Sequence, residues 1–289
     1  MNDESPKLYL SSFILHLSSL IVVLIDTHCH LTDRTLAPQA DAVLARARAA
    51  GVGRVITVAE DPADAYAALD LLRRHADVAL VAGVHPHRAG RCATETLSAL
   101  RALLCGDGLP DELRRRIVAV GETGLDFHYD FAPRARQEEV FGVQLQMACD
   151  LGRPVVIHAR ESEARVCDIL AGFPALAGRV VFHCFSGDTA IARRVLDLGD
   201  LLSFTGVVTF RSAGIIRASA RFAPLDRIMV ETDAPYLSPE PVRNVRPNEP
   251  ALLVHTARFL ADMRTETFEA LAAATTATAT RFFGLDRSD

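Results

Sequence analysis

The stretch Ile25-Asp26-Thr27-His28-Cys29-His30-Leu31 closes the first predicted strand and carries two histidines two positions apart. Successive side chains of a strand point to opposite faces, so His28 and His30 should share one face while Cys29 points to the other. Two imidazoles on one face at the end of a strand form half of a metal site. The other half depends on how the remaining strands end.

Short apolar runs, many of them β-branched, alternate along the chain with amphipathic segments. Such runs are typical of parallel strands that are buried on both faces. We expect strands at residues 21–25, 55–58, 78–82, 117–120, 155–157, 180–182, 201–204 and 228–230.

The segments between these strands have helical periodicity. One predicted helix face carries Val43, Leu44, Ala47 and Ala50, and another carries Val140, Val143, Met147 and Leu151. Glycines that favour a left-handed cap follow three predicted helices: Gly51, Gly152 and Gly199.

Eight strands interleaved with helices in a chain of 289 residues predict the α/β class and a closed (β/α)8 TIM-type barrel as a single domain. An open doubly wound sheet is the alternative. That fold usually begins with a glycine-rich turn after its first strand, and residues 27–30 occupy the place of that turn here. We expect the barrel to span residues 19–289.

The first residues resemble a targeting segment only in part. Residues 8–25 are apolar and uncharged, but Lys7 is the one preceding cation and no small-residue cleavage site separates the stretch from His28. We therefore expect residues 1–18 to be a poorly specified extension, and the protein to be cytoplasmic with no membrane partner. The oligomeric state stays open, and a monomer is compatible with the sequence.

The composition excludes several classes of chemistry. The net charge of -5 argues against a broad basic surface for nucleic acid. Lys7 is the single lysine, which excludes a Schiff-base lysine and a carbamylated lysine bridging two metals. Six scattered cysteines without a C-x-x-C pair predict reduced, mostly buried thiols, Cys184 among them in the core.

Histidines and acids cluster at the predicted strand ends, which converge on one mouth of a barrel. Imidazole and carboxylate ligands suit Zn²⁺, Mn²⁺ or Mg²⁺, and six such residues exceed what one ion needs. We expect two divalent ions per subunit. The predicted ligands are His28, His30, Glu122, His158, His183 and Asp233, with Glu122 bridging the ions.

Several residues near these ligands have alternative interpretations. His85 and His87 flank Pro86, where a ring could instead cap a turn. Asp126 and Asp130 are interpreted as solvated loop acids. The stretch at residues 238–250 reads as a long loop at the rim of the site.

Six motifs, taken together and in order, resemble the TatD-type metal-dependent hydrolases within the amidohydrolase-like superfamily. They are residues 25–31, 83–87, 121–126, 157–160, 182–187 and 231–237. The resemblance implies a divalent-metal deoxyribonuclease, typically a 3′–5′ exonuclease on single-stranded DNA or RNA, with the six ligands given above. The chain departs from the family at residues 243–250 and at Thr278, which puts the substrate-facing rim in question.

The predicted chemistry is hydrolysis by metal-activated water. Asp233 is the expected general base, with Glu122 as its catalytic partner at the ions. Phosphate or substrate contacts are expected from His87, Arg160, Arg243 and Arg246. Two alternatives remain open: an amidohydrolase or esterase acting on a small metabolite or a modified tRNA end, and a non-catalytic metal-binding scaffold.

Overall fold

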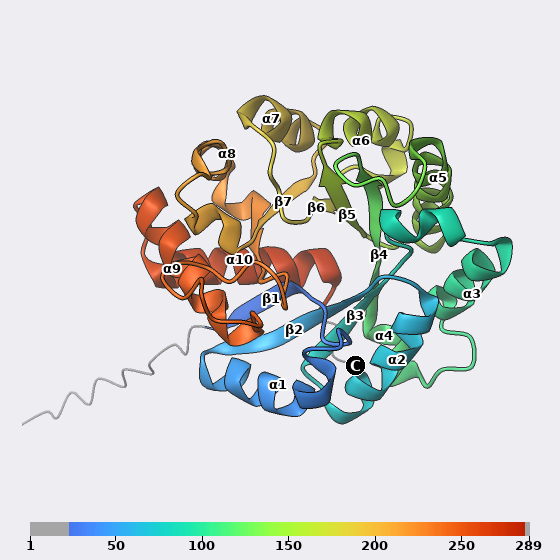
Figure 1. The fold of residues 1–289 in the computed structure, drawn as a ribbon, viewed down its shortest axis with the longest axis horizontal. Helices are drawn as coiled ribbons and strands as arrows, with labels where there is room; N and C mark the ends of the chain where they lie inside the picture. Colours follow the sequence, from blue (N-terminus) through green and yellow to red (C-terminus); the bar gives the residue numbers. More distant parts are fainter. Residues whose placement is uncertain (1–22, 287–289) are drawn as a thin grey trace, which may run out of the picture.

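The computed structural model describes residues 23–286, which form one eight-stranded parallel sheet surrounded by helices (Figure 1). The strands pair in chain order and are β1 (Leu24–Cys29), β2 (Val52–Ala59), β3 (Val78–Ala82), β4 (Ile117–Asp126), β5 (Val155–Arg160), β6 (Val180–Phe182), β7 (Leu201–Phe204) and β8 (Ile228–Val230). The helices are α1 (Ala40–Ala49), α2 (Pro62–Arg74), α3 (Thr94–Cys105), α4 (Asp111–Arg115), α5 (Arg134–Leu151), α6 (Glu163–Leu170), α7 (Thr189–Asp197), α8 (Gly214–Phe222), α9 (Leu253–Arg264) and α10 (Phe268–Phe283). The predicted extension, residues 1–18, lies outside the described residues.

The sheet closes on itself just beyond the ends of β1 and β8. Cys29 forms a parallel bridge with Ala234, and the His30 N–H donates to the Ala234 carbonyl at 2.7 Å. The Asp233 N–H donates to the His28 carbonyl at 2.9 Å. The (β/α)8 barrel prediction is confirmed, and the open-sheet alternative is excluded because an open sheet leaves its first and last strands apart.

Four strands have the predicted bounds, whereas β2, β4 and β5 run further than expected. In the extension of β4 and β5, Thr123 pairs with Ile157 and Gly124 with His158. Gly124 has φ +139, and a Cβ there would lie 2.1 Å from the His158 carbonyl oxygen. Only glycine lets the two backbones approach this closely. Glu122 therefore lies within a strand rather than after one.

β1 also begins and ends later than predicted. It runs from Leu24 to Cys29, so His28 is part of the strand itself. Residues 21 and 22 of the predicted strand lie outside the described part of the chain.

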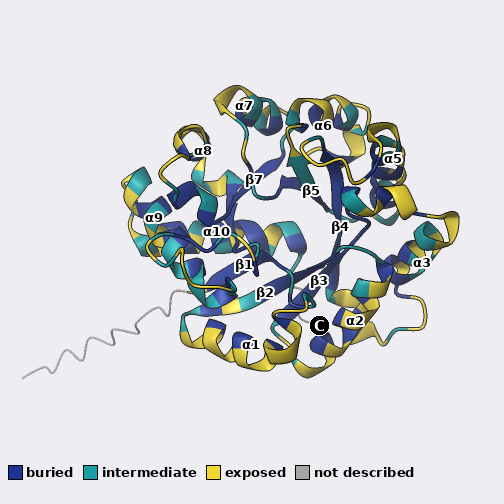
Figure 2. Cartoon of the chain, viewed as in Figure 1, coloured by how far each residue is buried: buried dark blue, intermediate teal, exposed yellow. Residues whose placement is uncertain are grey.

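The helices bury one face against the strands, as the colouring of Figure 2 shows. Val43, Leu44 and Ala47 of α1 are buried. On α5 the predicted face is partly wrong, because Val143 is 38% exposed while Val140 is buried. The three capping glycines have positive φ, which confirms their predicted role: Gly51, Gly152 and Gly199.

All six cysteines are free, but fewer are buried than expected. Cys29, Cys92 and Cys167 are buried, whereas Cys105 is exposed. Within residues 23–286, no helix combines the length and the apolar character that crossing a membrane requires.

Candidate metal centre

Glu122 on β4 is the centre of the site at the carboxyl ends of the strands. Its carboxylate is buried and lies 2.8 Å from His158 Nδ1, 3.0 Å from His183 Nε2 and 3.3 Å from His28 Nε2. His85 Nε2 is 3.5 Å away and His30 Nε2 is 3.9 Å away. One carboxylate thus faces five imidazoles that come from four different parts of the barrel.

The histidine pair of β1 has the geometry that strand alternation predicts. His28 Nε2 and His30 Nε2 lie 3.3 Å apart, while Cys29 is fully buried on the other face. Asp233, just after β8, places Oδ1 3.4 Å from His30 Nε2 and 3.9 Å from His28 Nε2. Closure of the barrel brings these residues together across some 200 positions of sequence.

A second carboxylate, that of Asp126, links His158 to a sixth histidine, His87. Its Oδ2 lies 2.8 Å from His87 Nε2 and 3.0 Å from His158 Nε2, and its Oδ1 accepts from the backbone N–H groups of His128 and Tyr129. The interpretation of Asp126 as a solvated loop acid is wrong: it is 1% exposed, because β4 continues through it. Asp130 is exposed, as expected.

Glu231 is a site residue that the sequence argument missed. Its Oε1 lies 3.1 Å from His183 Nδ1, and its carboxylate accepts from the Ser203 hydroxyl at 2.7 Å and from the Cys184 N–H at 2.6 Å. It therefore holds His183 by the ring nitrogen opposite to the one that faces Glu122. The available signal was its position directly after β8, two residues before Asp233.

Cys184 does not lie in the core as predicted. It is partly exposed, with Sγ 3.3 Å from the Thr205 hydroxyl. β6 ends at Phe182, and Cys184 has φ +45, so strand alternation no longer sets the direction of its side chain.

Burial and nearby opposite charges shift the pKa values of the site residues in opposite directions. Burial acts to raise the pKa of Glu122, but the facing His183, His85 and His28 outweigh it and hold that pKa well below its usual range. Burial also lowers the pKa of His85 to about 4, and burial together with His183 lowers the pKa of His28. A lowered pKa favours the neutral ring, which is the form that binds metal.

The donor set fits divalent ions. Three groups of side chains each bring three ligand atoms within 4.8 Å of one another: His28, His30 and Asp233; His28, Glu122 and His183; and His85, His87 and His158. The Nδ1 atom of His28 is buried without a hydrogen-bond partner among the described residues. A crowded set of imidazoles and carboxylates with few other donors is a coordination environment rather than a hydrogen-bond network.

The three predicted substrate-side arginines are exposed, whereas His87 belongs to one of the three ligand groups. The Arg160 guanidinium is 4.8 Å from the ring centroid of Tyr129, and that of Arg243 is 3.8 Å from the centroid of Phe210. Arg246 is exposed. His87 is half-buried against Asp126 and has its ring 4.7 Å from that of Phe131.

The two departures from the family pattern have different locations. Thr278 on α10 donates to the Asp226 carbonyl, just before β8 begins, so it belongs to the opposite end of the barrel and not to the rim. In the late loop, Asn248 is buried and donates to the carbonyls of Thr232 and Tyr236. That amide ties the loop to the segment that carries Asp233.

The comparisons with known proteins agree with this arrangement. The family model of the TatD-related DNases matches residues 25–284. The uncharacterized metal-dependent hydrolase YcfH of Escherichia coli is 37% identical over 92% of this chain and 97% of its own. The 3′–5′ ssDNA/RNA exonuclease TatD of Cronobacter sakazakii is 36% identical over 89% of this chain and 97% of its own.

Among solved structures, the TatD homologue YjjV of Escherichia coli is similar, with a TM-score of 0.85, 28% identity and coverage of 92% of this chain and 99% of that one. The chain is thus a hydrolase with a TIM barrel and a metal-type donor cluster at its mouth. It belongs to the TatD-related DNase family. This membership argues against the non-catalytic scaffold.

Proposed function

We propose that this protein removes nucleotides from the 3′ ends of single-stranded DNA or RNA by hydrolysis at two divalent ions. The observation that carries the proposal is how the two carboxylate oxygens of Glu122 are placed: Oε2 lies 3.3 Å from His28 Nε2, while Oε1 lies 2.8 Å from His158 Nδ1 and 3.0 Å from His183 Nε2. A carboxylate shared between two sets of imidazoles is the arrangement that a two-ion phosphodiesterase requires.

The residues divide into two sets around Glu122. His28, His30 and Asp233, which form one ligand group, would hold one ion. His158 and His183, which both approach Glu122 Oε1, would hold the other, with Glu122 shared. When bound, the ions would supply Lewis acidity and lower the pKa of a coordinated water.

Asp233 has the geometry of the general base. It reaches the two histidines of β1 through Oδ1, yet its side chain is 15% exposed, whereas that of Glu122 is 3% exposed. Asp233 can therefore face both the metal-ligand cluster and solvent in the mouth. We assign it the removal of the proton from the attacking water and Glu122 the fixed position of the ligand cluster.

Exposed aromatic rings at the mouth favour a single-stranded nucleic acid as substrate. Tyr129, Phe131 and Tyr236 are 41%, 64% and 48% exposed, although rings of this size are usually buried. Tyr129 and Phe131 lie against His87, and the Tyr236 ring is 6.3 Å from that of His30. Unpaired bases stack on such rings, and Arg160 beside Tyr129 could meet a phosphate.

The test is a metal-supplemented assay of end-labelled single-stranded DNA and RNA beside amide and ester substrates. We expect release of mononucleotides from the 3′ end, with a loss of at least 100-fold in kcat for Asp233→Asn. Turnover of amides or esters alone would replace this proposal with the amidohydrolase alternative.

A second comparison tests the aromatic rim. Tyr129→Ala should raise KM for oligonucleotides more than it lowers kcat, since base stacking contributes roughly 1–3 kcal/mol per base to binding. Tyr66→Ala is the matched control, because Tyr66 is 47% exposed on α2.

The cellular context is part of the same proposal. Among its relatives, those named as exonucleases act on ssDNA and RNA. We infer a cytoplasmic location. We also infer that one subunit completes the site, because every proposed ligand comes from a single barrel.

A further inference from the structure

A cavity of about 1010 Å³ opens at the end of the barrel opposite to the metal-ligand cluster. Its lining includes residues where strands begin, among them Val78 of β3, Val118 of β4 and Leu201 of β7. Glu122 lies four residues beyond Val118 on the same strand, which separates the two sites by more than about 10 Å. The cavity therefore cannot be part of the hydrolytic site.

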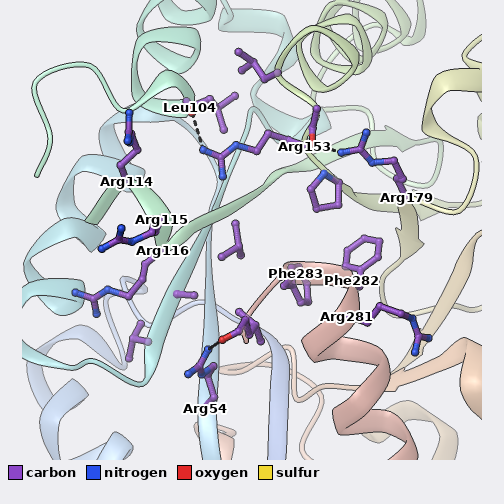
Figure 3. Close-up of a pocket in the computed structure, with 18 of the residues that line it drawn as sticks. Arg54, Leu104, Arg114, Arg115, Arg116, Arg153, Arg179, Arg281, Phe282 and Phe283 are labelled. Carbon is purple, nitrogen blue, oxygen red and sulfur yellow. Dashed lines mark hydrogen bonds between the residues drawn. The ribbon is translucent and has the colours of Figure 1, made fainter. Parts of the chain in front are cut away.

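The lining of this cavity is strongly basic. Of its 24 residues, eight are arginines and Glu112 is the one acid. The arginines are Arg54, Arg114, Arg115, Arg116, Arg153, Arg179, Arg227 and Arg281, and Figure 3 shows seven of them around one open space. About a quarter of the basic side chains thus line one cavity in a protein whose net charge is -5.

Three of the lining arginines, Arg179, Arg227 and Arg281, donate to backbone carbonyl oxygens. Arg227 donates to the Gly199 carbonyl at 2.7 Å, and Arg281 donates to the Asp226 carbonyl at 3.2 Å. Arg179 likewise donates to the Gly152 carbonyl. Carbonyl oxygens hold a guanidinium in place without neutralising it, and each guanidinium has five N–H donors, so donors remain for a further acceptor.

Two arginines of the lining form ion pairs with carboxylates of the described residues. Arg114 pairs with Asp111 at 2.8 Å, and Arg116 pairs with Glu112 at 3.0 Å. The Nε atom of Arg116 is buried and has no hydrogen-bond partner among the described residues. Burial lowers the pKa of Arg116, because the protein around it solvates the cation less than water does. An anion beside the Arg116 guanidinium would offset the loss of solvation.

The chemistry that fits this lining is an anion with several phosphates. Arginine forks match phosphate oxygens in pairs, and several arginines on one cavity need a ligand with more than one charge. The volume is at the upper end of the range for small-molecule sites, which suits a molecule of nucleotide size. Phe282, half-buried at the edge of the cavity, offers a ring against which a base could lie (Figure 3).

We propose that this arginine-lined cavity, at the end of the barrel where the strands begin, is a binding site for a small polyphosphate-bearing anion, such as a nucleoside triphosphate or an inorganic polyphosphate. The site is independent of the hydrolytic centre. It goes beyond the proposed function, because the anion would be bound rather than cleaved there.

The test is calorimetric titration of the full-length, metal-loaded protein with tripolyphosphate and with ATP. The pocket double variant, Arg179→Glu/Arg281→Glu, reverses the charge at a half-buried and an exposed position of the lining. The control double variant, Arg193→Glu/Arg73→Glu, makes the same change at two exposed positions outside the lining, on α7 and α2. We expect the pocket double variant to weaken binding at least 10-fold and the control double variant to weaken it less than 3-fold. If tripolyphosphate and ATP bind equally well, the cavity recognises the phosphates alone. If ATP binds more tightly, the ring of Phe282 also contributes by contacting the base.

Three further measurements keep the result interpretable. Asp233→Asn should leave tripolyphosphate binding unchanged, since loss of binding in that variant would place the anion at the metal centre and overturn the proposal. Absence of binding to the wild-type protein at millimolar ligand, or an equal loss in both double variants, would also overturn it. Circular dichroism of the pocket variant checks that the barrel is intact, and its hydrolytic activity should be retained, so this test can fail while the proposed nuclease activity stands.

Discussion

Glu231 and Glu122 contact opposite nitrogens of the same ring, that of His183. The 3.1 Å contact to Nδ1 from Glu231 sets the tautomer and rotation of the ring, and the 3.0 Å contact from Glu122 lies at Nε2. A carboxylate behind a metal-binding histidine typically raises the basicity of that ligand and fixes its direction. Glu231 is therefore a positioning residue rather than a ligand.

Glu231→Gln keeps the size of the side chain and removes its charge. We expect metal affinity and kcat to fall about 10- to 100-fold, because His183 loses the partner that orients it. Competition with a chelator measures the metal affinity, and the nuclease assay measures kcat. Glu269→Gln, at an exposed position of α10, should change neither. Equal behaviour of the two variants would remove Glu231 from the site.

Asp200 predicts a pH dependence that is separate from the metal centre. Burial raises its pKa from 3.8 to about 7 although it accepts from the Gly178 N–H at 2.9 Å. Between these two pH values the folded protein binds more protons than the unfolded chain, so the contribution of Asp200 to stability falls as pH rises from about 4 to 7 and then levels off.

Asp200→Asn should remove this slope. Relative to wild type, the variant should gain up to roughly 4 kcal/mol between pH 4 and pH 8, at about 1.4 kcal/mol per unit of pKa. Urea unfolding at a series of pH values gives the measurement, with exposed Asp197→Asn as the control. A difference between wild type and Asp200→Asn that does not vary with pH would show that Asp200 is not the titrating group.

Helix α5 is joined to the barrel through buried amides as well as apolar contacts. Gln144 accepts from the Val84 N–H at 2.7 Å and donates to the Val84 carbonyl at 3.0 Å and to the Thr123 hydroxyl at 2.7 Å. These bonds hold the β3 and β4 ends next to each other, directly behind Glu122. The apolar periodicity of α5 alone does not reveal them, and it placed the exposed Val143 on the buried face.

Gln144→Leu should destabilise the protein by roughly 2–4 kcal/mol, because it leaves the buried N–H and carbonyl of Val84 without partners. Gln146→Leu on the exposed side of the same helix should change stability by less than about 0.5 kcal/mol. Denaturant unfolding of both variants measures the difference. Similar losses in the two would mean that helix propensity, and not the buried amide, sets the effect.

Strand prediction was accurate where the strand is short and flanked by polar residues, as in β3, β6, β7 and β8. It failed at β4, whose pairing with β5 continues through Gly124 to Asp126. Two glycines and two acids within residues 121–126 are typical of a loop when only local preference is considered. Here tertiary pairing overrides that preference, and Asp126 becomes a buried partner of His87 and His158.

The barrel as a whole depends on joining β8 to β1, and the metal-ligand cluster lies on that seam. The Asp26 carboxylate accepts from the Thr232 N–H at 2.9 Å and from its hydroxyl at 2.6 Å, beside the backbone bonds of His28 and His30. One ion would bind His28 and His30 of β1 together with Asp233, which follows β8. Metal binding should therefore stabilise the closed barrel.

Removing the metal with a chelator should lower Tm, and adding Zn²⁺ or Mn²⁺ back should restore it. At a metal concentration about 100 times Kd the stabilisation is about 2.7 kcal/mol, which corresponds to a shift of several degrees for a chain of this size. His30→Ala should abolish most of the metal-dependent shift, measured by calorimetry. His255→Ala, outside the cluster, should keep it.

The order of strands and helices, and the residue types of the metal cluster, follow from local sequence. Apolar runs, helix periodicity and histidines at strand ends are encoded within a few residues, and a closed barrel brings all strand ends to one mouth. Other features came only from the tertiary structure. They are the partners of Glu231 and Asp126, the position of Thr278 away from the rim, and the cluster of arginines at the end of the barrel where the strands begin. Those features join side chains that lie tens to hundreds of residues apart, and their contacts depend on strand register and barrel closure, which no local pattern contains.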